Sequence, residues 1–254
     1  MKFKAFTLAE VLITLGIIGI VAALTIPSII SVYRKKVTET KLKQTYSILS
    51  TALTNAEAQL GEPYHIYYNE DQCPQNTFYC HDDLLYQDFI KPYVSENVKE
   101  INTNANSSAC WANINPPRNA FILFGKCATF PNGTSIVIYN ATIHVITDPY
   151  SSKKISLTPG KNLFNVGPIF SQCTGIPTKY CLNNVPHVLA PFHQIDDPGL
   201  GYIYTIRYRG KFTNEQMKEN CSKTSNEYAT RAAYCFQMYL ENNFTFPKDY
   251  PIRF

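Results

Sequence analysis

The chain has 254 residues, of which 45% are hydrophobic and 13% aromatic, and its formal net charge is +4 at pH 7. This length allows one large or two modest domains, and the apolar content is ample for a sizeable core, which excludes an intrinsically disordered protein. The charged residues are dispersed along the chain, so we expect no nucleic-acid partner.

The first predicted element is an apolar segment close to the N-terminus. Residues 11–33 contain no charged side chain. At about 1.5 Å of rise per residue, a helix of this length crosses a hydrocarbon core of about 30 Å, so we predict a transmembrane helix at about residues 11–33. A cleaved signal peptide, with residues 21–23 (VAA) as its cleavage site, is the alternative. Glu10 at the start of the run and the helical pattern beyond it count against a signal peptide.

A second helical pattern follows without a break. Apolar side chains recur every three or four residues and form one stripe, which consists of Leu42, Tyr46, Leu49, Leu53, Ala56 and Leu60. Gly61 and Pro63 then end the helix. We predict one helix over residues 6–60 whose stripe packs on the chain's own globular part. A coiled coil with a partner helix is the alternative.

Glu10 has two interpretations. An acid within a span costs about 2.5–3.5 kcal/mol on insertion scales and tends to persist only with a partner. At a helix start, however, its charge is also favoured by the helix dipole, and the residue can simply lie among the lipid headgroups.

The first 30 or so residues resemble the type IV pilins and the pseudopilins of type II secretion. The resemblance lies in a short basic leader, MKFKA, followed by FTLAEVLITLGIIGIVAALTIP, with family-typical residues at Phe6, Thr7, Leu8, Glu10, Gly19 and Pro27. It implies that a prepilin peptidase cuts between Ala5 and Phe6 and methylates the new amino group of Phe6. Ala5 stands where the family usually has Gly. It also implies that Glu10 pairs with the charged Phe6 amine of a neighbouring subunit in a filament.

Glycines and a proline lie within the predicted span. Gly16 and Gly19 leave a notch that lets helices approach closely, or they are ordinary glycines of a membrane helix. Pro27 cannot donate to the Ala23 carbonyl and weakens the helix there. In assembled members of the family that the segment resembles, this part of the helix stretches, so we interpret residues 19–27 as a hinge for extraction from the bilayer.

Basic residues flank the span on both sides. Lys2 and Lys4 precede it and Arg34, Lys35 and Lys36 follow it, which by the positive-inside rule favours a cytoplasmic C-terminal part. Pilin-like proteins insert with the leader inside, and the cysteines beyond the span indicate an oxidising compartment. We therefore expect a single-pass protein of the bacterial inner membrane whose head lies in the periplasm or outside the cell.

Residues 61–254 are predicted to form the globular head. Residues 81–98 start with acids suited to a helix N-terminus, and Pro92 bends or ends that helix. Three β-rich runs, at 119–130, 135–140 and 142–146, predict an antiparallel meander. Residues 148–170 and 190–210 are predicted to be loops with two more strands. A last helix is predicted over residues 227–243, with one face formed by Ala229, Ala232, Ala233, Phe236 and Leu240.

The predicted fold class is therefore α+β and pilin-like. It comprises a leader at residues 1–5, the N-terminal helix at 6–60, and a head at 61–254 that contains an antiparallel sheet and disulfide-braced loops.

All eight cysteines lie beyond the apolar segment: Cys73, Cys80, Cys110, Cys127, Cys173, Cys181, Cys221 and Cys235. An even count in this context indicates disulfides, with pairing of sequence neighbours the simplest connectivity. Zinc is the weaker alternative, because the spacings are wider than those of zinc knuckles. On one continuous helix Cys221 and Cys235 would lie about 21 Å apart, beyond disulfide reach. Either the chain breaks between them or they have other partners.

Signatures of catalysis do not occur in the sequence. It contains no glycine-rich phosphate loop, GxSxG elbow or HExxH motif, so we expect no enzyme and no cofactor. Some major pseudopilins bind calcium through loop acids, which makes Asp196 and Asp197 weak calcium candidates. Their spacing fits no calcium loop, and Asp-Asp-Pro-Gly is typical of a turn.

The resemblance implies a structural subunit of a type IV pilus-like or type II secretion pseudopilus filament. Its implied partners are copies of itself, other pilin-like subunits, the prepilin peptidase and methyltransferase, an inner-membrane assembly platform and membrane lipid. Two alternatives remain open at this point. One is a minor tip subunit whose large head binds a surface, DNA or a secreted substrate, and the other is an exported enzyme delivered by the N-terminal segment.

Overall fold

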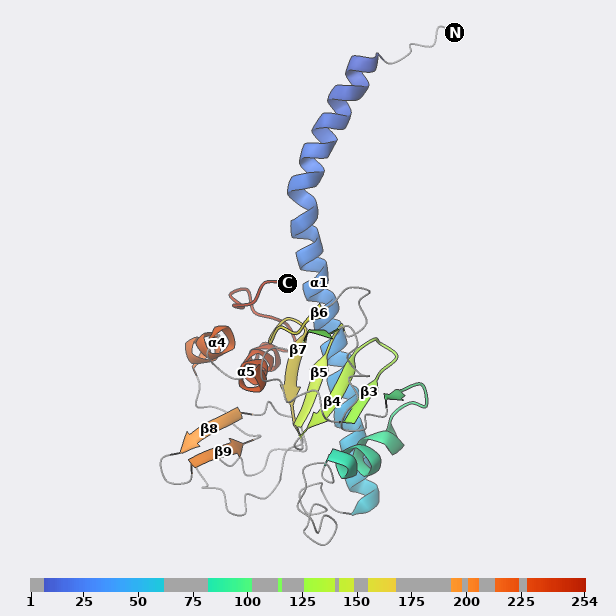
Figure 1. Ribbon diagram of the computed structural model, residues 1–254, viewed down its shortest axis with the longest axis vertical. Helices are drawn as coiled ribbons and strands as arrows, with labels where there is room; N and C mark the ends of the chain where they lie inside the picture. Colours follow the sequence, from blue (N-terminus) through green and yellow to red (C-terminus); the bar gives the residue numbers. More distant parts are fainter. Residues whose placement is uncertain are drawn as a thin grey trace.

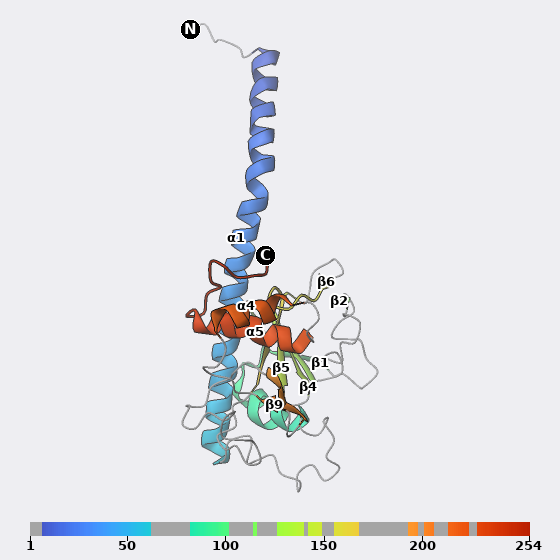
Figure 2. The same ribbon diagram turned by 90° about the vertical axis from the view of Figure 1, so that its left-hand side faces the viewer.

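A computed structural model of the chain shows a long helix, α1, that projects from a head of one main sheet and shorter helices (Figures 1 and 2). The structure describes residues 7–61, 82–101, 114–115, 126–139, 142–148, 155–167, 193–197, 201–205, 213–223 and 228–254. The predicted leader and the cleavage residues Ala5 and Phe6 lie outside these ranges.

α1 (Leu8–Leu60) is one uninterrupted helix of 53 residues. Its N-cap is Thr7, and its C-cap is Gly61, whose φ of 75° is the left-handed conformation that glycine adopts without strain. Pro27 lies inside the helix, which continues on both sides of it. The prediction of a single long helix that ends at Gly61 is confirmed, while Pro63 lies outside the described residues.

The apolar stripe of the second half of α1 packs on the head, as predicted. Leu42, Leu49, Leu53 and Ala56 are buried in the main core, and Tyr46 is packed against it. The last member of the stripe, Leu60, is 36% exposed at the helix end. The stripe is therefore covered by the chain's own head, which removes the need for a coiled-coil partner.

The main sheet has five antiparallel strands in the order β1-β3-β4-β5-β7. The strands are β1 (Lys99–Ile101), β3 (Lys126–Thr129), β4 (Ser135–Tyr139), β5 (Thr142–Ile146) and β7 (Leu163–Val166). The meander β3-β4-β5 confirms the prediction, although residues 119–125 of its expected first run lie outside the described residues. Alternate side chains of these strands, such as Ile136, Ile138 and Ile143, pack in the core with α1.

The regions predicted as loops with two strands contain four. β7 lies in the first of them and forms an edge of the main sheet. Short β6 (Ile155–Ser156) pairs in parallel with β2 (Ile114–Asn115), and β8 (His193–Asp197) pairs with β9 (Gly201–Thr205) in an antiparallel ribbon. The prediction undercounted the strands. One of them, β6, has only two residues and shows no periodicity, and all four depend on pairing with other segments rather than on a pattern of their own.

Short helices flank the sheet and α1. Residues 82–84 form a helical turn that continues into the π-helix η1 (Leu85–Ile90) and the 3₁₀-helix η2 (Lys91–Tyr93). The predicted helix thus ends one residue after Pro92. α4 (Asn214–Ser222) and α5 (Tyr228–Glu241) follow the sheet, with α5 beside β7 (Figure 1).

The predicted last helix is confirmed as α5, but it is buried on more than one face. Every residue from 231 to 239 is buried, because α5 packs between β7 and α4 and also reaches α1. An apolar stripe on one face predicts burial of that face only, so it did not predict that the other faces of α5 are buried by further elements.

Candidate functional site

The first half of α1 is the candidate functional site, because its apolar side chains are exposed and the described part of the head does not cover them. Its large apolar residues are between 42% and 79% exposed: Leu8, Val11, Leu12, Ile13, Leu15, Ile17, Ile18, Ile20, Val21, Leu24, Ile26, Ile29, Ile30, Val32 and Tyr33. This part of α1 is long and apolar enough to cross a membrane. An exposed apolar surface of this size needs a cover of lipid or protein.

Glu10 closes a capping box with Thr7 at the start of this segment. The Thr7 N–H and hydroxyl donate to Glu10 Oε2 at 2.9 and 2.8 Å, and the Glu10 N–H donates to Thr7 Oγ1 at 3.3 Å. The two residues therefore satisfy N–H groups that a helix start would otherwise leave free. Sequence patterns do carry the signal for this pairing, since Thr-x-x-Glu is the capping-box pattern, although neither interpretation of Glu10 included it.

Gly16 and Gly19 lie on open surface of the helix. A Cβ atom built at either position meets no atom of the chain within 4 Å. The head therefore gives no reason for glycine at these positions, and any close approach that they allow is to another molecule.

Polar side chains inside the span bond back to the helix. Thr14 Oγ1 donates to the Val11 carbonyl, and Thr25 Oγ1 donates to the Val21 carbonyl, both at 2.9 Å. Ser28 Oγ donates to the Thr25 carbonyl at 2.8 Å. These hydroxyls need no water, so the segment is compatible with a dry surrounding.

The C-terminal segment, residues 242–254, contacts α1 directly after the exposed half of the helix. Glu39 of α1 is buried, and its Oε1 accepts the Phe246 N–H at 2.9 Å. Tyr239 of α5 donates its hydroxyl to the Glu39 carbonyl at 2.7 Å. Burial raises the pKa of the Tyr239 phenol, with a further contribution from the Glu39 charge, so this donor stays protonated. We call the contacts of Glu39 with Phe246 and Tyr239 the helix clasp.

Aromatic side chains complete the helix clasp. Phe246 lies 5.0 Å from Tyr239 and 4.8 Å from Phe254, measured between ring centroids. On the other side, Tyr46 of α1 lies 5.3 Å from Phe244. Such ring pairs add to the apolar burial that holds the C-terminal segment on α1.

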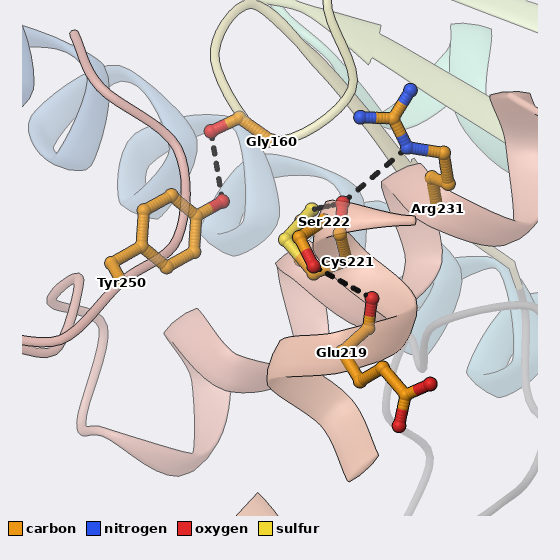
Figure 3. Close-up of a disulfide and its surroundings, with 7 residues drawn as sticks. Gly160, Glu219, Cys221, Ser222, Arg231 and Tyr250 are labelled. Atoms are coloured by element: carbon orange, nitrogen blue, oxygen red, sulfur yellow. Dashed lines mark hydrogen bonds between the residues drawn. A yellow bond between two sulfur atoms is a disulfide. The ribbon is translucent and has the colours of Figure 1, made fainter. Parts of the chain in front are cut away.

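A disulfide fixes the elements that support the clasp. Cys221 of α4 and Cys235 of α5 form a disulfide, with Cα atoms 4.9 Å apart. The helix is therefore interrupted between them, which is one of the two predicted alternatives. Tyr250 donates its hydroxyl to the Gly160 carbonyl at 2.8 Å beside this disulfide (Figure 3). The disulfide, the turn at Gly160 and the C-terminal segment therefore meet at one point.

The remaining predicted site residues are only partly placed. Cys127 of β3 is also disulfide-bonded, and no cysteine of the described part of the chain is free. Five cysteines lie outside the described residues: Cys73, Cys80, Cys110, Cys173 and Cys181. Their pairing remains a prediction.

The calcium prediction is not tested by this structure. Asp196 and Asp197 end strand β8, in register with Tyr202 and Gly201 of β9. Within the residues that the structure describes, no three His, Cys, Asp or Glu side chains gather in a way that could hold a metal ion.

A pocket of about 130 Å³ lies between α4, α5 and the C-terminal segment. Its lining residues are Asn214, Met217, Met238, Glu241, Asn242, Pro247 and Asp249. Ligand sites usually enclose about 300–1,000 Å³, so this pocket is smaller than a typical ligand site.

Comparison with known proteins gives one match. Residues 28–166 match a family described as a family of unknown function (DUF6613). No curated protein and no solved structure matches the chain. The match begins at the end of the apolar segment and covers the second half of α1 and the main sheet.

Proposed function

Because the chain belongs to DUF6613, a family of unknown function, we propose a function from its geometry: a structural subunit of a filament of the type IV pilus or type II secretion pseudopilus kind. One observation carries the proposal. A single continuous helix of 53 residues joins an exposed apolar half to a half that is packed in the head. This form lets the same helix reside in a membrane first and pack among its copies afterwards.

The proposal includes processing at the N-terminus. A prepilin peptidase removes residues 1–5 and methylates Phe6. The new Phe6 amine of one copy then pairs with the Glu10 carboxylate of a neighbouring copy. Two opposite charges in a dry helical bundle offset each other's desolvation, and removal of one leaves the other stranded.

The proposed place of the protein is the bacterial inner membrane, with the head in the periplasm, followed by assembly into a filament. The disulfide between Cys221 and Cys235 supports an oxidising compartment for the head. Catalysis by the head is no part of the proposal.

Intact mass spectrometry of the protein from cells tests processing. We expect loss of Met1 to Ala5, a gain of one methyl group, and a further mass deficit of two hydrogens for each disulfide. Cleavage after Ala23 instead would identify a signal peptide and refute the proposal.

Three substitutions separate the charge of Glu10 from its role in the capping box. Glu10→Ala removes both, and we expect a protein that inserts in the membrane but forms no filaments. Glu10→Gln keeps a capping side chain without the charge and should also fail to assemble. Thr7→Ala removes the capping hydroxyl, keeps the charge, and should still assemble.

Electron microscopy of sheared filaments and membrane fractionation provide the readouts. Normal filaments from Glu10→Gln would refute the charge pairing.

A further inference from the structure

Basic side chains gather where α1 leaves the head. Arg34, Lys35 and Lys36 follow the apolar half of α1 directly, and Lys248 and Arg253 belong to the C-terminal segment. Both views show that segment beside α1 at this end of the head (Figures 1 and 2). Lys35 joins the two groups, because its Nζ donates to the Pro247 carbonyl at 3.4 Å. We call these five side chains the basic collar.

Most of the collar is free to bind a partner. Arg34, Lys248 and Arg253 are exposed and make no ion pair with the residues that the structure describes. Lys36 is 73% exposed and only approaches Glu39, at 3.5 Å. Because Glu39 is buried, part of the Lys36 charge serves this ion pair, and the collar cations free of ion pairs with the described residues are Arg34, Lys248 and Arg253.

Acidic groups at this end neutralise only part of the collar. Glu39 is buried, and one of its oxygens is taken by the Phe246 N–H. Asp249 is exposed, but it pairs with Lys218 at 3.1 Å. Among the described residues, positive charge therefore predominates around the base of the exposed helix.

The collar lies at a particular depth if residues 11–33 cross a bilayer. These residues give about 35 Å of helix against a hydrocarbon thickness of about 30 Å. Arg34 then falls in the headgroup layer. Tyr33, which is 68% exposed, falls at the boundary where aromatic side chains of membrane helices are enriched. The contact between Lys35 and Pro247 brings the C-terminal segment to the same level.

We propose that the basic collar binds the phosphate groups of anionic lipids in the membrane that holds the first half of α1. The proposal rests on the membrane-inserted stage of the proposed function. Guanidinium and ammonium groups are the usual protein ligands of phosphate, and cations close to an anionic bilayer surface are attracted to it. The collar thus gives the head its own contact with the bilayer, next to the apolar contact of the span.

This contact also gives a role to the basic residues after the span. Arg34, Lys35 and Lys36 oppose the predicted orientation under the positive-inside rule. Because they bind headgroups on the side where the head lies, they hold the subunit at the surface until it is extracted.

Native mass spectrometry of the full-length chain tests the collar. The protein is held in micelles of a neutral detergent doped with phosphatidylglycerol or with phosphatidylcholine. We expect retained phosphatidylglycerol and little phosphatidylcholine. The variant Arg34→Gln/Lys248→Gln/Arg253→Gln should bind phosphatidylglycerol at least about tenfold more weakly, because each cation near an anionic surface contributes several-fold to affinity.

A control variant removes three cations that lie outside the collar. Lys91→Gln/Lys99→Gln/Lys126→Gln changes the net charge equally, on η2, β1 and β3. Two of these lysines lie toward the other end of the head, since Tyr93 of η2 donates to Gln59 near the C-terminal end of α1 and Lys126 pairs with Asp83 just before η1. The control should bind phosphatidylglycerol as the parent does. Melting curves of both variants verify that the head is folded.

Several outcomes would overturn the collar proposal. One is that the collar variant retains as much phosphatidylglycerol as its parent. Another is that the control variant loses as much phosphatidylglycerol binding as the collar variant. A third is that the parent retains phosphatidylcholine as well as it retains phosphatidylglycerol. Displacement of the lipid by inorganic phosphate at equal concentration would also overturn it, because the collar would then be a site for free phosphate. Cleavage at Ala5 is scored separately by intact mass, so failure of the pilin-like function and failure of the collar are distinguished.

Discussion

At the scale of single residues, His144 is a buried titratable group in the middle of the main sheet. It lies on β5, in register with Val137 of β4 and Asn165 of β7. The side chain is 2% exposed, and its Nδ1 finds no hydrogen-bond partner among the described residues. Burial lowers the pKa of the imidazole from 6.5 to about 4, so His144 is neutral in the folded head at pH 7.

The neutral His144 makes the head sensitive to acid. In the unfolded chain the imidazole takes up a proton below about pH 6.5, whereas the folded protein resists until about pH 4. The stability present above pH 6.5 therefore declines as the pH falls, by up to about 3 kcal/mol near pH 4. His144→Gln removes this titration, so its urea midpoint should fall less between pH 7 and pH 4.5 than that of the parent. Parallel declines would contradict the assignment.

At the scale of elements, the turn before β7 is held against two other parts of the head. Gly160 has a φ of 78°, and its carbonyl accepts the Tyr250 hydroxyl. A Cβ atom at this position would lie 2.5 Å from Cys235 Sγ and 2.7 Å from the Tyr250 oxygen. Only glycine fits between the turn, the disulfide and the C-terminal segment.

Gly160→Ala should therefore destabilise the head through two effects. The positive φ costs about 1 kcal/mol or more for a residue with a Cβ, and the displaced neighbours add about 1–3 kcal/mol. We expect a total loss of about 2–4 kcal/mol in the free energy of unfolding, measured by urea denaturation.

Gly133→Ala provides the control for this prediction. Gly133 has the same φ of 78°, but a Cβ there meets only the end of the Lys41 side chain, at 3.6 Å. It should lose the conformational part alone. Equal losses for the two variants would show that the close approach at Gly160 contributes nothing.

At the scale of the whole molecule, α1 is about 80 Å long, and only its second half is covered by the head. A pull on the exposed half is passed to the head through the helix itself, the core stripe and the helix clasp. The clasp lies close to the exposed half, and only the contact of Lys35 with the Pro247 carbonyl lies nearer to it. Its state therefore affects how firmly the C-terminal segment holds this part of the helix.

Glu39→Leu should open the clasp. It leaves the Phe246 N–H buried without an acceptor, which costs about 1–3 kcal/mol, whereas Glu39→Gln keeps an acceptor oxygen and should cost less. Hydrogen exchange of the Phe246 amide, followed by mass spectrometry, reports the opening directly. Unchanged protection of this amide in Glu39→Leu would mean that the aromatic contacts alone hold the C-terminal segment.

Local patterns predicted the elements with regular periods. Leu42 to Ala56 at helical spacing predicted the buried stripe, and Gly61 predicted the helix end. The PNGT turn predicted the hairpin that joins β3 and β4. The partners of Glu39 and Gly160 could not be predicted, because they are distant in the sequence. Phe246 lies 207 residues from Glu39, and Tyr250 lies 90 residues from Gly160.

Interactions between near neighbours in the chain specify the long helix, its apolar first half, its end at Gly61 and the central meander, because capping, turn chemistry and periodicity are local. Long-range packing specifies the bond between Cys221 and Cys235, the addition of β7 to the sheet, and the contact of the C-terminal segment with α1 at Glu39. These features join residues that are brought together by collapse of the whole head. For the same reason, the two basic groups of the collar, at residues 34–36 and 248–253, are far apart in the sequence but lie side by side in the fold.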